Sequence, residues 1–145
     1  MMVERLFVGT KGSKGATCRT NTSRRDVVGR PLRIYIPDRM KEGDGPNLPA
    51  LLALKAEGIG LVVTVDCGIT AVDQVAYANS CGLDVIICDH HEAADVIPNA
   101  YAVLDPIQPG DTYPFKNLCG CGVGFKLIQG IAIRLGKESL LPHFL

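Results

Sequence analysis

The sequence predicts an α/β fold in which helices cover both faces of a parallel sheet. Two observations favour this class. Short runs such as residues 61–66 and 85–89 are apolar throughout, which is typical of strands that are buried on both faces. Between these two runs, residues 70–82 carry apolar side chains at the spacing of a helix. A length of 145 residues suits a single domain built from such alternating units.

The regular pattern begins at Arg30. Residues 33–37, RIYIP, form a short β-rich run that a proline closes. Residues 47–58 have helical apolar spacing and end at a glycine, a residue often found just after a helix. Residues 61–66, LVVTVD, follow as a continuous apolar strand with Asp66 at its end. This part of the chain therefore predicts a strand, a helix and a second strand.

The alternation continues toward the C-terminus. The helix predicted over 70–82 has Thr70 as its expected N-cap, because a threonine hydroxyl can accept from a first-turn amide. Residues 85–89, VIICD, are a third apolar strand, and residues 100–106, AYAVLDP, are the candidate for a fourth. A long helix is predicted over 121–136, where it ends at a glycine.

Charge is balanced over the whole chain and unbalanced along it. The formal net charge is zero, but residues 1–30 contain seven lysines and arginines against two acids, a net charge of +5. A basic segment of this kind is typical of an arm that binds nucleic acid, and a solvated tail is the alternative.

Six cysteines without a secretory signal pattern predict reduced thiols and a cytoplasmic protein. We expect structural roles for all six. Cys67, Cys81 and Cys88 lie in or beside apolar segments, and Cys119 and Cys121 lack two further ligands nearby that would complete a zinc site. No apolar run approaches the roughly 18 residues that cross a bilayer, so no membrane segment is expected.

Polar side chains follow three of the predicted strands. Asp38, Asp66 and Asp89 stand at strand ends, and His90 and His91 follow directly. Because parallel strands deliver their carboxyl ends to one edge of the sheet, these groups should converge. Carboxylates with imidazole suit Mn²⁺ or Mg²⁺. Turn and capping roles are the alternative, but two adjacent imidazoles contribute little to packing, which favours a metal site.

Four segments together resemble the DHH phosphoesterase superfamily and, within it, the single-strand-specific 5′→3′ exonucleases. They are CDHH at 88–91, TVDCGIT at 64–70, IYIPDRMKEGDGPN at 34–47 and DPIQPGDTYPFKNLCGCGVGFKL at 105–127. The resemblance runs over about residues 30–145 and includes the order of the segments. It implies a DHH phosphoesterase-like domain.

The resemblance also implies a metal-dependent hydrolase that acts on single-stranded DNA in repair and recombination, with single-strand-binding or repair proteins as partners. It implies two Mn²⁺ or Mg²⁺ ions, with Asp66 bridging them and His90 as a ligand. Asp89 would orient its neighbour, and His91 would lie near the scissile phosphate as a hydrogen-bond or proton donor.

Four further residues are expected to contact nucleic acid. Arg39 and Lys41 lie beyond the first predicted strand, where they could bind the backbone of a single strand. GCGVGFK at 120–126 opens a helix with three glycines, so the amides around Gly122 could receive a phosphate, and Lys126 follows. The alternatives are close helix–sheet packing for the glycines and solvated positions for Arg39, Lys41 and Lys126.

Residues 1–29 depart from the superfamily pattern. Aligning GAT at 15–17 places Gly12 and Lys14 where the superfamily has acids, and a polar, arginine-rich run replaces an apolar helix. We expect this segment to be aberrant or poorly ordered, through a local frameshift or as a divergent basic arm, with 30–145 a partial DHH domain. Losing the first strand would leave an unpaired sheet edge.

Two other functions fit the same residues. One is a DHH phosphoesterase that acts on short oligonucleotides. The other is a degenerate, non-catalytic module that only binds nucleic acid, which the missing acids at Gly12 and Lys14 favour and the intact Asp89–His90–His91 run disfavours.

Overall fold

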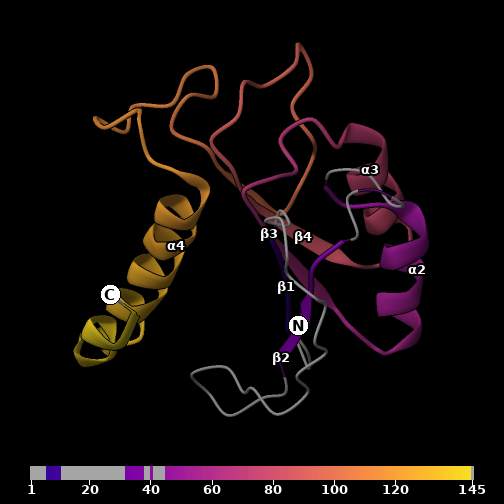
Figure 1. The fold of residues 1–145 in the computed structure, drawn as a ribbon, viewed down its shortest axis with the longest axis horizontal. Helices are drawn as coiled ribbons and strands as arrows, with labels where there is room; N and C mark the ends of the chain where they lie inside the picture. Colours follow the sequence, from indigo (N-terminus) through magenta and orange to yellow (C-terminus); the bar gives the residue numbers. More distant parts are fainter. Residues whose placement is uncertain (1–5, 11–31, 38–39, 41–44, 145) are drawn as a thin grey trace.

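A five-stranded parallel sheet forms the centre of the computed structural model, which describes residues 6–10, 32–37, 40 and 45–144 (Figure 1). The strand order is β2-β1-β3-β4-β5, and every neighbouring pair is parallel. The strands are β1 (Leu6–Thr10), β2 (Leu32–Tyr35), β3 (Leu61–Val65), β4 (Asp84–Cys88) and β5 (Ala102–Leu104).

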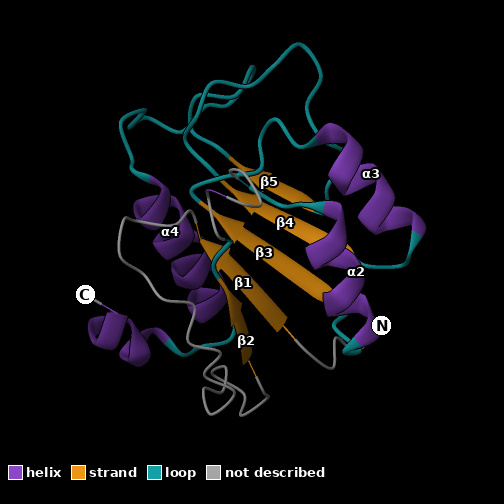
Figure 2. Cartoon of the chain, turned by 45° about the vertical axis from the view of Figure 1, so that its right-hand side comes forward, coloured by secondary structure: helices purple, strands orange, loops and turns teal. Residues whose placement is uncertain are grey.

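Helices lie on both faces of this sheet, as the sequence predicts (Figure 2). They are α2 (Leu48–Ala56), α3 (Val72–Ser80), α4 (Gly120–Arg134) and the short 3₁₀ helix η1 (Glu138–Phe144). Helices α2 and α3 cover one face, and α4 covers the other. No helix in the described part of the chain is long and apolar enough to cross a membrane.

Two apolar clusters fill the space between sheet and helices. The cluster under α2 and α3 comprises Leu51, Leu54, Ile59, Val62, Val75, Ala78, Leu83, Val85 and Ile87. The cluster under α4 centres on Val63, Cys88 and Val123. Neighbouring residues of one strand, Val62 and Val63, face opposite clusters, which explains why the strands are apolar at every position.

The starts of α2 and α3 differ in how they are capped. Asn47 caps α2, because its side-chain oxygen accepts from the amide of Ala50 at 2.9 Å. The prediction that Thr70 caps α3 is wrong, because Ala71 is the N-cap and no side chain caps the helix. Before α3 the chain turns tightly, with the amide of Val72 bonded to the carbonyl of Thr70 at 3.0 Å.

Strand β1 lies inside the sheet, between β2 and β3, and was not predicted. Leu6 pairs with Leu32 of β2 on one side and with Leu61 of β3 on the other. The expectation of an unpaired edge in place of the first strand is therefore wrong, because residues 6–10 fill that position. The predicted boundary at Arg30 stays a prediction, since residues 11–31 lie outside the described residues.

Candidate metal centre

Three aspartates line up at the carboxyl edge of the sheet. Asp66 follows β3, Asp89 follows β4 and Asp105 follows β5. Backbone hydrogen bonds fix the stagger, because the amide of Asp66 donates to the carbonyl of Cys88 at 2.9 Å and that of Asp89 to Leu104 at 3.0 Å. The parallel register thus places successive carboxylates beside one another.

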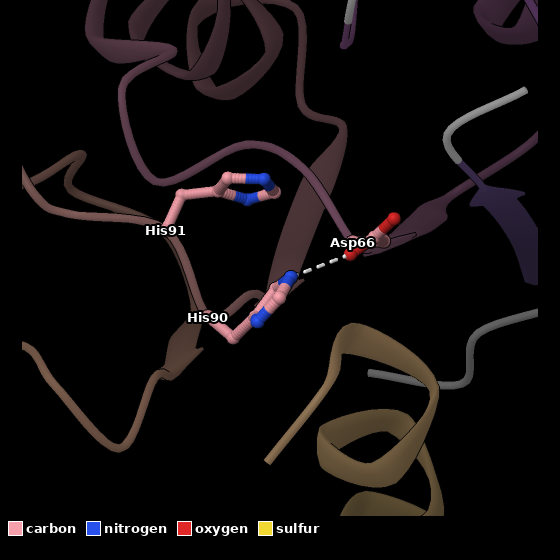
Figure 3. A group of neighbouring side chains, drawn as sticks. All are labelled: Asp66, His90 and His91. Atoms are coloured by element: carbon pink, nitrogen blue, oxygen red, sulfur yellow. Dashed lines mark ion pairs between the residues drawn. The ribbon is translucent and has the colours of Figure 1, made fainter. Parts of the chain in front are cut away.

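The side chains of Asp66, His90 and His91 converge at this edge (Figure 3). Nε2 of His90 lies 2.9 Å from Oδ1 of Asp66. One possible ligand atom from each of the three residues lies within 4.8 Å of the others, and all three side chains are half-buried. Among the residues that the structure describes, this is the group suited to holding a metal ion.

The backbone at Asp66 adopts a conformation that residues other than glycine rarely adopt. Its φ is 66°, and it is the one non-glycine residue with a positive φ in the described part of the chain. The left-handed region costs most residues roughly 1 kcal/mol, but aspartate and asparagine are tolerated there better than others. A carboxylate held at a strained turn beside two imidazoles is typical of a functional site.

Asp89 is the buried support of the group. Its side chain is 1% exposed, and its carboxylate accepts from the amide of Ile69 at 3.0 Å and from the amide of His90 at 2.8 Å. Nδ1 of His91 lies 2.6 Å from the same carboxylate. Asp89 therefore fixes the ring of His91, whereas it contacts His90 only through the backbone. A carboxylate partner at Nδ1 orients the imidazole ring of His91.

We expect Asp89→Asn to destabilise the fold by about 1–3 kcal/mol, the cost of a buried polar group without a partner. The amide nitrogen of asparagine would face either the amide of Ile69 or the donors of His90 and His91, so two donors would meet. Urea unfolding measures the loss. Asp95→Asn, at an exposed loop position, is the matched control and should stay within about 0.5 kcal/mol. Equal stabilities for the two variants would contradict the role of Asp89.

Helix α4 begins directly against Asp66. A Cβ placed on Gly120 would lie 2.4 Å from Oδ1 and 2.6 Å from Cα of Asp66. One turn later, a Cβ on Gly124 would lie 3.4 Å from Val65. Of the two roles left open for these glycines, close packing is the one that the contacts of Gly120 and Gly124 support.

The predicted nucleic-acid contacts are placed in part. Gly122 lies near the Leu118 side chain, where an added Cβ would come within 3.2 Å. Lys126 is half-buried and donates to Gln129 at 3.0 Å. Arg39 and Lys41 lie outside the described residues, as do Asp38, Gly12 and Lys14. The nucleic-acid roles of Arg39, Lys41, Gly122 and Lys126 stay predictions.

Comparison with known proteins decides the family. Residues 7–144 match the model of the DHH family, N-terminal domain. The chain belongs to the DHH family. The match includes residues 7–29, which the resemblance drawn from motifs alone left out.

Several relatives of this DHH chain carry the same name. The single-stranded-DNA-specific exonuclease RecJ of Bacillus subtilis is 51% identical over 106 residues, which are 73% of this chain and 14% of the relative. RecJ of Escherichia coli is 38% identical over 136 residues, 92% of this chain and 24% of the relative. The chain thus spans less than a quarter of the length of either protein.

A solved structure has the same fold. The crystal structure of exonuclease RecJ bound to manganese superposes with a TM-score of 0.69 and 27% identity. The superposition covers 91% of this chain and 34% of that one. The predicted α/β DHH fold is therefore confirmed.

Asp105 is a residue of the DHH edge that sequence reasoning missed. It is 1% exposed, and its Oδ1 accepts from the amide of Ile107 at 3.0 Å, while no partner reaches Oδ2. It lines a cavity of about 160 Å³ together with Tyr113 and Lys126. The signal was present, because Asp105 directly follows the apolar residues 100–104 as Asp66 follows 61–65.

Burial raises the pKa of Asp105, and the nearby Asp89 carboxylate raises it further, although the amide of Ile107 and the two histidines oppose them. An acid with a raised folded-state pKa contributes stability that is present below its unfolded pKa and lost as the pH rises through the folded pKa. Asparagine cannot ionise. We therefore expect Asp105→Asn to gain stability relative to the wild type as the pH rises from acid to neutral.

Urea unfolding of wild type and Asp105→Asn across this pH range measures the difference. Asp95→Asn, which is exposed, supplies the control for the loss of one charge. Parallel curves of stability against pH for wild type and Asp105→Asn would show that burial does not raise the pKa of the Asp105 carboxyl.

Proposed function

We propose that the chain is part of a metal-dependent exonuclease that degrades single-stranded DNA in the 5′→3′ direction. The convergence of Asp66, His90 and His91 at the carboxyl edge of a DHH sheet carries the proposal. The name of its relatives, single-stranded-DNA-specific exonuclease RecJ, supports the substrate. Because the chain spans only part of those relatives, the activity is proposed for a longer protein that contains this segment.

The donor set suits manganese. A carboxylate with an imidazole ligand, Asp66 with His90, fits Mn²⁺ better than Mg²⁺, which prefers oxygen ligands throughout. The manganese in the related RecJ crystal structure supports the same choice. Asp66 and His90 would hold the ion, which would polarise a phosphate oxygen and lower the pKa of water. The proposed second ion needs carboxylates beyond this group.

His91 has a separate proposed task. Its Nδ1 is held by Asp89, and we assign to Nε2, the other ring nitrogen, the task of donating to a phosphate oxygen or transferring a proton to the departing group. The ring cannot turn without breaking its 2.6 Å contact with a buried carboxylate. Asp89 therefore acts as a positioning residue for His91.

A chimera tests the proposed function. Residues 30–145 replace the matching segment of the Bacillus subtilis RecJ, and the product is assayed with Mn²⁺ on a 5′-labelled single strand, on the matching duplex and on dinucleotides. We expect degradation of the single strand and little of the duplex. Cleavage of dinucleotides alone would favour the short-oligonucleotide alternative. A folded chimera that binds the single strand and cleaves nothing would favour the non-catalytic module.

His90 and His91 should differ in kind. His90→Ala removes a ligand and should weaken Mn²⁺ binding, whereas His91→Ala should spare the metal and slow the chemical step by about 10²–10⁴-fold, the usual contribution of a positioned acid or base. Calorimetric Mn²⁺ titration and single-turnover rates in the chimera separate the two effects. Glu92→Ala, the exposed neighbour, is the control. Equal losses of affinity would show that both rings bind metal.

A further inference from the structure

Two exposed thiols meet at the start of α4. The sulfurs of Cys119 and Cys121 lie 3.2 Å apart, and neither residue belongs to an apolar cluster. Cys88, by contrast, is fully buried under α4 and has the structural role expected of it. We propose that Cys119 and Cys121 form a thiol-oxidation site that a hydroperoxide converts into a reversible intrachain disulfide.

The surroundings give the two thiols different parts in this reaction. The Cys121 thiol, as a hydrogen-bond partner, and the backbone amide of Gly122 lower the pKa of Cys119. The same contact raises the pKa of Cys121. Cys119 is also the N-cap residue of α4, where unpaired amides favour a negative charge. Cys119 is thus the attacking thiolate, and Cys121 is the thiol that resolves the product.

The reaction balances with hydrogen peroxide, the simplest hydroperoxide, as the oxidant. The Cys119 thiolate attacks one peroxide oxygen, so an S–O bond forms, the O–O bond breaks and the second oxygen leaves as water after taking a proton. Cys121 then attacks the Cys119 sulfenic acid, so the S–S bond forms and the S–O bond breaks. The Cys121 proton leaves with the hydroxyl as a second water. Two thiols lose two electrons and two protons in total.

Closing the bond draws together the two residues that flank Gly120. A disulfide holds its sulfurs about 2.05 Å apart, so the pair has to approach by roughly 1.1 Å from 3.2 Å. Gly120 is the residue between the two cysteines, and it has no spare room against the Asp66 backbone. We therefore infer that oxidation displaces Gly120 relative to Asp66. The effect of this displacement on metal binding rests on the proposed function, whereas the thiol chemistry does not.

Mass spectrometry of the full chain tests the thiol site. The reduced, metal-free protein is treated with hydrogen peroxide and mapped without reduction. We expect the loss of two of the six titratable thiols and a link confined to Cys119 and Cys121. Cys81→Ser, remote from α4, should behave as the wild type, and Cys121→Ser should accumulate a sulfenic acid at Cys119 that dimedone traps. Unlinked, scattered or interchain oxidation in the wild type would overturn the proposal.

Amide chemical shifts test the displacement. In the metal-free chain, oxidation should move the ¹H–¹⁵N signals of Gly120 and Asp66 and leave that of Ala78, in α3, unchanged. Reduction should restore them, and the Cys119→Ser/Cys121→Ser variant should show no change. Unmoved Gly120 and Asp66 signals in a chain with a mapped disulfide would refute the displacement. Neither measurement uses metal or DNA. Both results are therefore independent of whether the proposed nuclease function holds.

Discussion

Replacing Asp66 by asparagine is expected to abolish hydrolysis by the chimera and to weaken Mn²⁺ binding by this chain. The carboxylate lies 2.9 Å from His90 and is the one acid of the Asp66–His90–His91 group, so its removal takes away the charge that attracts the cation. Asparagine keeps the size of the side chain and tolerates the φ of 66° at this position. The loss should therefore be chemical rather than structural.

The measurement compares Mn²⁺ affinity, hydrolysis and unfolding in the same preparation. Asp66→Asn should change the free energy of unfolding little, because asparagine keeps the size of the half-buried side chain and tolerates its backbone conformation. Asp95→Asn should keep both metal binding and activity, because it removes a carboxylate at an exposed position outside the group. Near-normal turnover of Asp66→Asn at saturating Mn²⁺ would show that this carboxylate is not a ligand.

Gly120→Ala is expected to produce the largest structural effect. The added methyl would lie 2.4–2.6 Å from three atoms of Asp66, and one of them is the backbone Cα, which cannot turn aside. Helix α4 must then move away from β3, at a cost of about 1–3 kcal/mol for overpacking. The same shift should disturb Asp66 and weaken Mn²⁺ binding.

Gly130→Ala is the matched control, because it makes the same change in the same helix. A Cβ on Gly130 would meet no atom within 4 Å, so alanine should stabilise the helix by up to about 1 kcal/mol. Urea unfolding should therefore give opposite signs for the two variants. Stabilisation by both would mean that Gly120 does not lie against Asp66.

Most of the sheet and its helices could be predicted because apolar runs and helical spacing are local signals. The strand predicted over 61–66 is observed over 61–65, and the helix predicted over 121–136 is observed over 120–134. Strand β1 was not predicted, because LFVGT is short and precedes a polar run without periodicity. Its position between β2 and β3 depends on pairing with distant residues, which no local pattern reveals.

In the candidate site, too, local sequence patterns predicted some features, and others depended on contacts between distant residues. Strand ends predicted the meeting of Asp66 with His90 and His91, because parallel register carries residues of that kind to one edge. Which histidine Asp89 holds could not be predicted, since it depends on side-chain geometry. The contact of Gly120 with Asp66 also required the structure, because the two residues belong to elements far apart in the sequence.

The position of β1 has a consequence for synthesis on the ribosome. β1 leaves the ribosome before both of its partners, and β3 follows only after residue 65 has been made, several seconds later at about 5–20 residues per second. Until then β1 has only β2 as a possible partner, and its other edge is open to pairing with other nascent chains. The arrival of β3 gives β1 its second partner and delivers Asp66, but the sheet and the candidate metal centre are complete only after β4 and β5, with His90 and His91 between them, have also been made.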